Sequence, residues 1–328
     1  MVGSRGRSRP WPSNSPKAAG APSAAQRRSE AMRRKLTRRR IALAFAVLAV
    51  ACLGIQLNRT QLWEDRQLHG GWRVQQHVVL HSCRLLDREN ATRARGWGED
   101  CAAALEEAKR VESLVPASRH LVLLLHGMGR STFLFRDLQR DLRAAGYEAV
   151  AISYPSLTRD IAGHADQIEA LLNAADDVEQ VSFVAHSLGG LVVREALSRE
   201  APWRARLALG RVVMLAPPNQ GSQLAGALEA LPPYHWIGGP SASEIAAGGP
   251  FAALPDGVEV AVIAGGTDDG RGFNSLLPGD NDGVVTVAET QLAGVRDSMT
   301  VNAIHTLIAA APETIAATLN FLAYGRLR

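Results

Sequence analysis

The sequence has few cysteines, a single long apolar run and little positive charge outside its first 40 residues. Three cysteines (Cys52, Cys83 and Cys101) are too few for a disulfide-rich scaffold or a cysteine-built metal module. One long uncharged apolar stretch excludes a multi-span membrane protein. Because 46% of the residues are hydrophobic and the net charge is only +4, the chain is not disordered throughout. Its length is enough for one good-sized core with appendages.

Charge is distributed unevenly along the chain. Residues 1–40 contain twelve Lys or Arg and one acidic residue, whereas the remaining residues contain 24 basic and 31 acidic ones. The part expected to fold is therefore mildly acidic. A nucleic-acid-binding protein needs a basic face on its folded domain, so we expect no nucleic-acid partner.

A basic tail and an apolar segment precede the part of the chain that is expected to fold. Residues 1–40, rich in Ser, Pro, Ala, Gly and Arg, are predicted to be a disordered basic tail. Residues 41–57 are uncharged and apolar, and as a helix they would rise roughly 26 Å, near the minimum for crossing a bilayer. The Arg cluster before them predicts that the tail stays cytoplasmic and that the rest crosses the membrane.

The apolar segment 41–57 allows two interpretations. We favour an uncleaved signal anchor, which makes the protein single-pass. The alternative is a cleaved signal peptide, because Ala49-Val50-Ala51 fits the small-x-small pattern of a cleavage site. Arg outnumbers Lys 33 to 3, which is typical of a GC-rich genome, so we expect a bacterial membrane protein with its folded domain facing the periplasm.

Residues 58–117 are predicted to be a helical, polar connecting region. Export to an oxidising compartment favours a disulfide between Cys83 and Cys101, worth about 3 kcal/mol in the chain-entropy model. The alternative is two free, partly buried thiols.

From residue 118 onward, apolar runs of strand length alternate with amphipathic stretches. The apolar runs predict strands at 121–125, 148–152, 181–185, 211–216 and 258–264. The amphipathic stretches predict helices at 131–145, 160–175, 191–197 and 312–323. Strands without polar alternation, separated by helices, predict an α/β fold with a parallel sheet covered on both faces. Residues 221–257 contain no clear strand and are a candidate lid or cap.

The strongest local motif is Ala185-His186-Ser187-Leu188-Gly189, which lies between a predicted strand and a predicted helix. A nucleophile on a sharp strand-to-helix turn needs small residues two positions before and after it, and Ala185 and Gly189 satisfy this. The helix after Ser187 directs its free N–H groups and positive dipole end at the hydroxyl. Ser187 is therefore the candidate nucleophile.

Residues 118–328 resemble the α/β-hydrolase superfamily, and within it bacterial lipase- and esterase-like serine hydrolases. Four motifs carry the resemblance in the expected order: His126-Gly127-Met128-Gly129 after a strand, the Ser187 motif, Asn281-Asp282-Gly283, and a late His305. Ala185 departs from the usual first glycine of the nucleophile motif. The resemblance implies an eight-stranded, mostly parallel sheet and a Ser–Asp–His triad in that chain order.

Within this resemblance His305 is the candidate general base, because it is the one histidine after residue 235. Asp282 is the favoured acid, with Asp268, Asp269 and Asp280 as alternatives. The acid fixes the imidazole tautomer and stabilises the imidazolium without taking the proton.

The predicted oxyanion hole consists of two backbone donors, the N–H groups of Met128 and Leu188. His126 and His186 are expected to shape the loops beside these motifs. We expect neither a metal nor an organic cofactor.

The sequence therefore predicts a serine hydrolase that cleaves carboxylic esters through an acyl-enzyme, with an ester or lipid-like substrate. Two alternatives remain open. An acyltransferase would use the same three residues, and a membrane-tethered binding protein on an inactive hydrolase fold would not need them.

Overall fold

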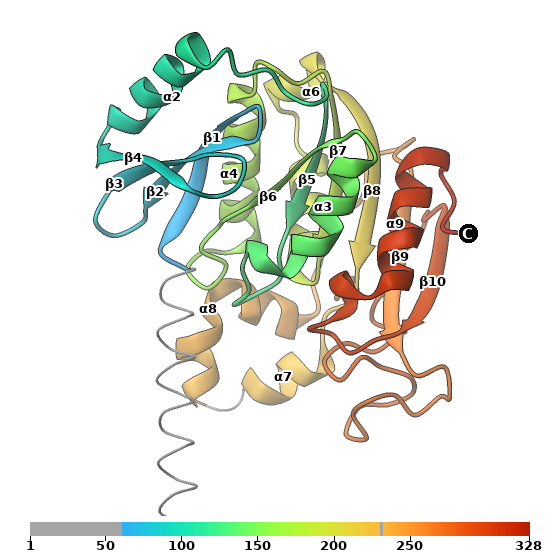
Figure 1. Cartoon of the computed structure of the whole chain (residues 1–328). Helices are drawn as coiled ribbons and strands as arrows, with labels where there is room; N and C mark the ends of the chain where they lie inside the picture. Colours follow the sequence, from blue (N-terminus) through green and yellow to red (C-terminus); the bar gives the residue numbers. More distant parts are fainter. Residues whose placement is uncertain (1–60, 230–231) are drawn as a thin grey trace, which may run out of the picture. The chain divides into compact units, whose positions relative to one another are not determined.

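The computed structural model describes residues 61–229 and 232–328 of the chain. The basic tail predicted at 1–40 and the apolar segment predicted at 41–57 lie outside these residues. Among the helices within them, none has both the length and the apolar character needed to cross a membrane. The described residues form a four-stranded sheet followed by a six-stranded sheet with helices on both faces (Figure 1).

The prediction of a helical region at 58–117 is wrong for most of its described residues. Four antiparallel strands pair in chain order: β1 (Trp63–His69), β2 (Trp72–His77), β3 (Ser82–Leu86) and β4 (Thr92–Trp97). Gly70 and Gly71 form the first hairpin turn with φ of 51° and 79°, which glycine adopts without steric cost. One helix, α2 (Asp100–Val111), follows these strands.

Helix α2 packs on one face of the antiparallel sheet. Val74, Leu85 and Leu105 are buried together in a small apolar core between them. Cys83 of β3 and Cys101 of α2 form the expected disulfide, with a Cα–Cα distance of 6.0 Å. The helix is thereby covalently joined to the sheet.

The α/β class is confirmed by the second sheet. It consists of six parallel strands in the order β10-β9-β8-β7-β5-β6. The strands are β5 (His120–Leu125), β6 (Glu148–Ile152), β7 (Gln180–His186), β8 (Ala208–Leu215), β9 (Val260–Gly266) and β10 (Asp297–Asn302). Within the described residues this sheet therefore has six strands, not the eight that the resemblance implies. The chain before β5 forms the separate antiparallel sheet instead of extending this one.

Helices bury both faces of the parallel sheet, which explains why its inner strands are largely apolar, whereas the edge strand β10 is mostly polar. Leu121 and Leu123 of β5 belong to the core on one face, whereas Val122 and Leu124 belong to the core on the other. The first face carries α4 (Ile161–Ala174), α5 (Leu188–Ser198) and α6 (Pro202–Arg206). The second carries η1 (Thr132–Phe135), α3 (Arg136–Ala144), η2 (Ile308–Ala310) and α9 (Pro312–Tyr324).

The predicted cap at 221–257 contains two helices, α7 (Gln223–Glu229) and α8 (Pro232–Ala247), and no strand within its described residues. The helical geometry of α8 is interrupted at Gly239, where φ is 70° and ψ is −177°, and Pro240 follows. Both helices lie beyond the carboxyl ends of the parallel strands (Figure 1). This is the edge at which open parallel sheets bind ligands.

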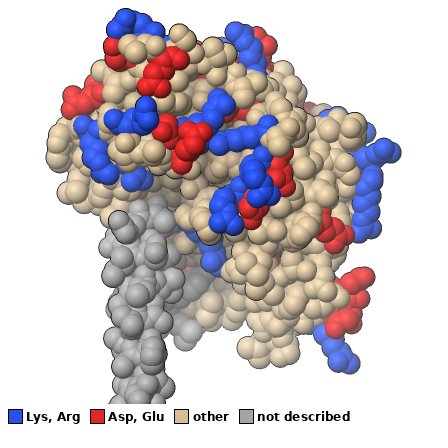
Figure 2. Space-filling view, viewed as in Figure 1, with Lys and Arg blue, Asp and Glu red and all other residues tan. Residues whose placement is uncertain are grey.

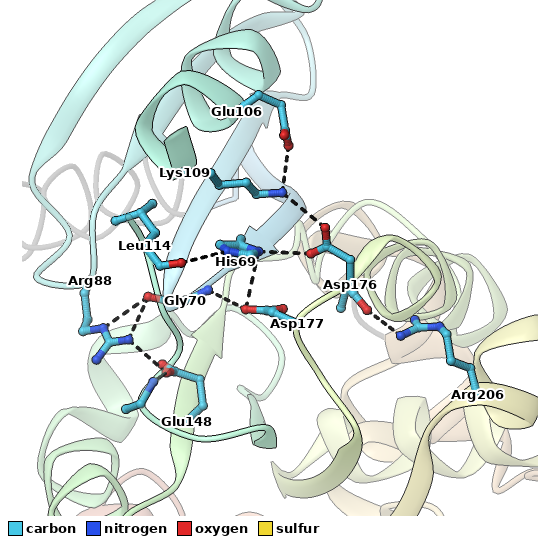
Figure 3. A network of polar contacts seen from close by, with 12 residues as sticks. His69, Gly70, Arg88, Glu106, Lys109, Leu114, Glu148, Asp176, Asp177 and Arg206 are labelled. Carbon is cyan, nitrogen blue, oxygen red and sulfur yellow. Dashed lines mark hydrogen bonds and ion pairs between the residues drawn. The ribbon is translucent and has the colours of Figure 1, made fainter. Parts of the chain in front are cut away.

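Polar contacts fix the first hairpin to the parallel sheet (Figure 3). The Gly70 N–H donates to the buried Asp177 carboxylate, with an N–O distance of 2.7 Å, in the loop between α4 and β7. Arg88 donates to the Gly70 carbonyl at 2.9 Å and forms an ion pair with Glu148, a buried residue of β6. The antiparallel sheet is thus held against the edge strand of the larger sheet.

Candidate active site

Ser187 lies on a sharp turn between β7 and α5. Its backbone has φ 53° and ψ −123°, a conformation that non-glycine residues adopt only when the surroundings enforce it. Its N–H donates to the Leu215 carbonyl of β8 at 2.9 Å. Gly189 follows in the first turn of α5, where an added Cβ would lie 2.5 Å from the Leu125 carbonyl oxygen. The small residue required two positions after Ser187 is therefore explained by the approach of β5.

His305 lies in the loop after β10 and reaches Ser187 from there. The distance between His305 Nε2 and Ser187 Oγ is 3.1 Å. The His305 backbone N–H donates to the Asp282 carbonyl at 2.9 Å, and the side chain is 7% exposed. The ring is thus anchored by backbone and shielded from water, with one nitrogen directed at the hydroxyl.

Asp282 holds the other ring nitrogen. Its Oδ2 is 2.6 Å from His305 Nδ1. Its Oδ1 accepts from the N–H groups of Val284 and Val285, at 2.9 and 2.7 Å. Because an ionised carboxylate only accepts, Nδ1 carries the proton and Nε2 is left free to accept one from Ser187.

The alternative acids do not contact His305. Asp280 instead accepts from the N–H groups of Thr267 and Asp268, at 2.8 and 2.9 Å. Asp269 accepts from the Arg271 N–H in the same turn, at 2.8 Å. These carboxylates organise the turn after β9, whereas Asp282 is the one that reaches the imidazole.

The predicted oxyanion donors lie on the two segments that approach Ser187. Leu188 is the first residue of α5, so its N–H has no acceptor within the helix. Met128 lies in the loop after β5, next to Gly127. A Cβ on Gly127 would lie 3.0 Å from Ser187 Cβ and 2.8 Å from His186 Nδ1, so glycine permits this close approach.

Gln61 and Ser156 support the Met128 loop, and sequence reasoning missed both. Ser156 Oγ accepts from the Gly129 N–H at 3.0 Å and donates to Gln61 Oε1 at 3.0 Å. Gln61 Nε2 donates to the Arg130 carbonyl at 3.1 Å. Both side chains are buried. The two residues after Met128 are therefore held by a segment at the start of the antiparallel sheet.

His126 and His186 are buried and remain neutral at physiological pH. Burial lowers the pKa of His126 to about 4 and lowers the pKa of His186 well below its usual value. His126 stacks on Tyr154 with ring centroids 4.3 Å apart, and His186 Nε2 lies 2.9 Å from the His305 carbonyl oxygen. Both histidines shape the loops around Ser187.

An apolar cavity of about 130 Å³ opens beside Ser187. Its lining comes mainly from the Met128 loop, the cap helices and the loop that holds Asp282: Met128, Ser187, Pro218, Ser222, Leu224, Ala225, Leu228, Ile245, Val284 and Val285. Trp236 and Ile237, which the sequence placed in the cap, have side chains outside the described part of the structure.

One group of described residues brings together the ligand atoms of a possible metal site. His69, Asp176 and Asp177 place these atoms within 4.8 Å of one another. His69 Nδ1 is 3.0 Å from Asp176 Oδ1, Lys109 Nζ is 3.6 Å from Asp176 Oδ2, and the Gly70 N–H binds Asp177 (Figure 3). Hydrogen bonds and ion pairs within the protein therefore already engage both carboxylates. The cluster precedes β7, at the end of the sheet opposite Ser187.

Comparison with known families gives one match. Residues 87–230 match a family model described as a domain of unknown function, DUF7379. The matched range includes Met128 and Ser187 but ends before Asp282 and His305. No curated protein matches the sequence.

The solved structures similar to this chain include lipases and esterases. Lipase BlEst2 from Bacillus licheniformis, in its mature form, is 20% identical over 62% of this chain and 89% of its own, with a TM-score of 0.46. Carboxylesterase CesB from Bacillus subtilis is 16% identical over 64% and 86% of the two chains, with a TM-score of 0.42. The metagenomic carboxyl esterase MGS0156 is 20% identical over 58% and 66%, with a TM-score of 0.44.

The predicted resemblance to lipases and esterases thus has structural neighbours of that kind, at 16–20% identity. Because each TM-score lies below 0.5, we base the function proposed below on the distances within this chain.

Proposed function

We propose that this protein is a serine hydrolase that cleaves carboxylic esters through an acyl-enzyme. The observation that carries the proposal is the unbroken chain of contacts from Ser187 Oγ to His305 Nε2, 3.1 Å, and from His305 Nδ1 to Asp282 Oδ2, 2.6 Å. Three segments from separate parts of the chain meet in this order, which is the order that nucleophilic catalysis by a serine requires.

In the first half-reaction, Ser187 Oγ attacks the ester carbonyl carbon while its proton moves to His305 Nε2. Asp282 keeps the proton on Nδ1 and stabilises the resulting imidazolium. The negative charge on the carbonyl oxygen is bound by the N–H groups of Met128 and Leu188. His305 then gives its proton to the departing alcohol, and the acyl group remains on Ser187.

In the second half-reaction, water replaces the alcohol. His305 Nε2 takes a proton from the water as its oxygen attacks the acyl carbon, and the same two N–H groups bind the oxyanion. Collapse of this intermediate returns the proton to Ser187 Oγ and releases the carboxylic acid. Net consumption is one ester and one water, and no step uses a cofactor.

The cavity beside Ser187 favours a short acyl chain. Its volume of about 130 Å³ is small and its lining is mostly apolar. Leu228 lies on its wall, so Leu228→Ala enlarges it. We expect p-nitrophenyl butyrate to have a higher kcat/KM than the octanoate ester in the wild type, and Leu228→Ala to shift the preference toward octanoate.

Activity-based labelling tests the nucleophile. A fluorophosphonate probe should label the wild-type protein and leave Ser187→Ala unlabelled. Ser187→Ala and His305→Ala should each lower kcat for p-nitrophenyl butyrate by about 10⁴-fold, with little further loss when they are combined. Labelling that persists in Ser187→Ala, or turnover that survives His305→Ala, would contradict the proposal. Added glycerol distinguishes hydrolysis from acyl transfer, because a transferase forms the glycerol ester.

We also infer membrane attachment from the sequence at 33–57, where a basic cluster precedes an apolar segment. An immunoblot after carbonate washing tests this. An anchored protein stays in the membrane pellet, whereas a protein released by cleavage is found in the soluble fraction.

A further inference from the structure

The antiparallel sheet carries an unusual row of arginines on the face opposite α2. In the strand register, Gln75 of β2 pairs with Arg84 of β3, and Arg84 pairs with Arg95 of β4. Arg73 precedes Gln75 by two residues and so lies on the same face. Like charges directly opposite each other on neighbouring strands destabilise a sheet. The arrangement of Arg84 beside Arg95 therefore calls for a compensating anion.

Arg84 is held in a fixed orientation with its terminal nitrogens free. Its guanidinium carbon lies 4.1 Å from the centre of the Trp63 ring, and its Nε donates to Gln75 Oε1 at 2.8 Å. Within residues 61–229 and 232–328, the terminal nitrogens have no hydrogen-bond partner and the side chain has no ion pair. Stacking and the Nε bond leave the outer edge of the guanidinium available for a bidentate oxyanion.

The surroundings of Arg84 disfavour an unpaired charge. Burial lowers its pKa to about 10, and the neighbouring positive charges of Arg73 and Arg95 act in the same direction, against the attraction of Asp65. Asp65 is itself engaged, because Arg73 Nη1 binds its carboxylate at 3.1 Å. A partly buried cation without a bonded carboxylate is stabilised when an anion enters.

Arg84 faces a cavity of about 490 Å³ between the antiparallel sheet and the segment of η1 and α3. Arg136 and Thr132 line the opposite wall, and Thr92 adds a hydroxyl from β4. On this side of the molecule, Lys and Arg side chains lie beside Asp and Glu side chains over the antiparallel sheet and α3 (Figure 2). Among the described residues of the lining, Glu89 is the one acidic residue. Of the three arginines, Arg73 pairs with Asp65 and Arg136 with Asp137, which leaves Arg84 without an ion pair in the described part of the chain.

We propose that this cavity, the Arg84 cavity, binds a phosphate monoester, with the Arg84 guanidinium holding two of its oxygens. Donors on two facing walls suit a tetrahedral group with several acceptor oxygens better than a planar carboxylate with two. The remaining volume accommodates a small organic group attached to the phosphate. The site is separate from Ser187 and does not depend on the proposed esterase activity.

Titration of the full-length protein in dodecyl maltoside micelles tests the proposal. Inorganic phosphate and glycerol 3-phosphate are added at constant ionic strength, and both Tm and tryptophan fluorescence are recorded, because Trp63 contacts the proposed ligand residue. We expect saturable changes in both signals. Arg84→Gln should weaken binding by about tenfold or more, as expected for a lost hydrogen-bonded charge.

A matched control removes the same charge outside the cavity. Arg140 of α3 is exposed and forms ion pairs with Asp137 and Asp141, so Arg140→Gln should bind phosphate like the wild type. Arg84→Gln should keep its Tm without phosphate. If Arg84→Gln does not fold, Arg84→Lys is used instead. It keeps the charge but loses the planar guanidinium that can hold two oxygens, so it should bind phosphate more weakly than the wild type.

Two further arms distinguish the source of the phosphate. Micelles containing phosphatidic acid are compared with micelles containing phosphatidylcholine. Tighter binding to phosphatidic acid than to glycerol 3-phosphate indicates a lipid headgroup, whereas equal affinities indicate a soluble ester. The proposal is overturned if the wild type shows no saturable response, or if Arg84→Gln binds as tightly as the wild type.

Discussion

Gln61, just before β1, connects the start of the antiparallel sheet to the loop that carries the proposed Met128 oxyanion donor, and its replacement tests that connection. Gln61 Oε1 accepts from Ser156 Oγ at 3.0 Å and from the Leu157 N–H at 3.1 Å, while Nε2 donates to the Arg130 carbonyl at 3.1 Å. Gln61→Ala removes all three hydrogen bonds. It also leaves the buried Ser156 hydroxyl without its acceptor, so the bond from Ser156 to Gly129 is no longer fixed.

The size of the effect follows from what the loop does. Complete loss of one oxyanion donor lowers kcat by about 10²–10³-fold. Gln61→Ala leaves the Met128 N–H in place but loosens the residues after it, so we expect kcat to fall by about 10-fold to 100-fold. Stability should also fall, by about 1–3 kcal/mol for the buried partners left unpaired. KM should change little, because the acyl cavity does not include Gln61.

Two measurements separate positioning from general destabilisation. Kinetics with p-nitrophenyl butyrate are measured at a temperature at which the variant is fully folded, and the affinity for a trifluoromethyl ketone is measured alongside. Because that inhibitor forms a bound oxyanion, its affinity should fall by the same factor as kcat/KM. Gln76→Ala is the control, since Gln76 lies in β2 and accepts from Arg66 instead of contacting the loop. If Gln61→Ala retains kcat within about a factor of two while folded, the loop does not depend on this side chain.

Three other predictions concern the acid, the disulfide and a buried histidine. Asp282→Asn should lower kcat by about 10⁴-fold because the amide favours the wrong imidazole tautomer, whereas Asp280→Asn should lower it by less than about tenfold; equal losses in steady-state assays would contradict the assignment. Reducing the Cys83–Cys101 bond should lower the free energy of unfolding by about 3 kcal/mol, and unchanged urea midpoints with and without reductant would refute this. Burial lowers the pKa of His164 to about 4. Because the unfolded chain binds its proton near pH 6.5, stability should be full above that pH and fall toward pH 4, by at most about 3 kcal/mol. Across this pH range the urea midpoint should vary less in His164→Leu than in the wild type. An equal dependence of the midpoint on pH in both proteins would contradict a contribution from His164.

Five of the six parallel strands were predictable because they contain buried apolar runs, whereas the edge strand β10 is mostly exposed or half-buried and was not predicted. Residues 121–125 form an unbroken apolar run, and β5 occupies His120–Leu125. The same reasoning failed at 58–117, where the strands are exposed or polar on one face. In β2, Arg73 and Gln75 alternate with Val74, so few apolar residues signal the strand. The glycine pair at 70 and 71 was the local sign of a hairpin, since both residues have positive φ.

The residues of the candidate site also differ in how far the sequence around them reveals them. Some are marked by their neighbours in the chain, and others depend on contacts with distant segments. Ser187 is marked by its immediate neighbours, because the strained turn and the approach of β5 restrict residues within two positions of it. The choice of Asp282 over Asp280 depends on contacts with other strands. An added Cβ at Gly265 of β9 would lie 2.7 Å from Asp282 Cβ and 2.6 Å from the Ala303 carbonyl oxygen, so glycine there lets the acid approach the loop that holds His305.

Gln61 illustrates the limit of such reasoning, because it is separated from Arg130 by 69 residues and from Ser156 by 95. A buried glutamine is recognisable only when its partners are known, since each of its polar atoms must be satisfied by groups that the fold brings to it. The Met128 motif indicates where the proposed oxyanion donor lies along the chain. We expect the rigidity of the proposed donor, on which its electrostatic effect depends, to come from Gln61, which lies just before the antiparallel sheet.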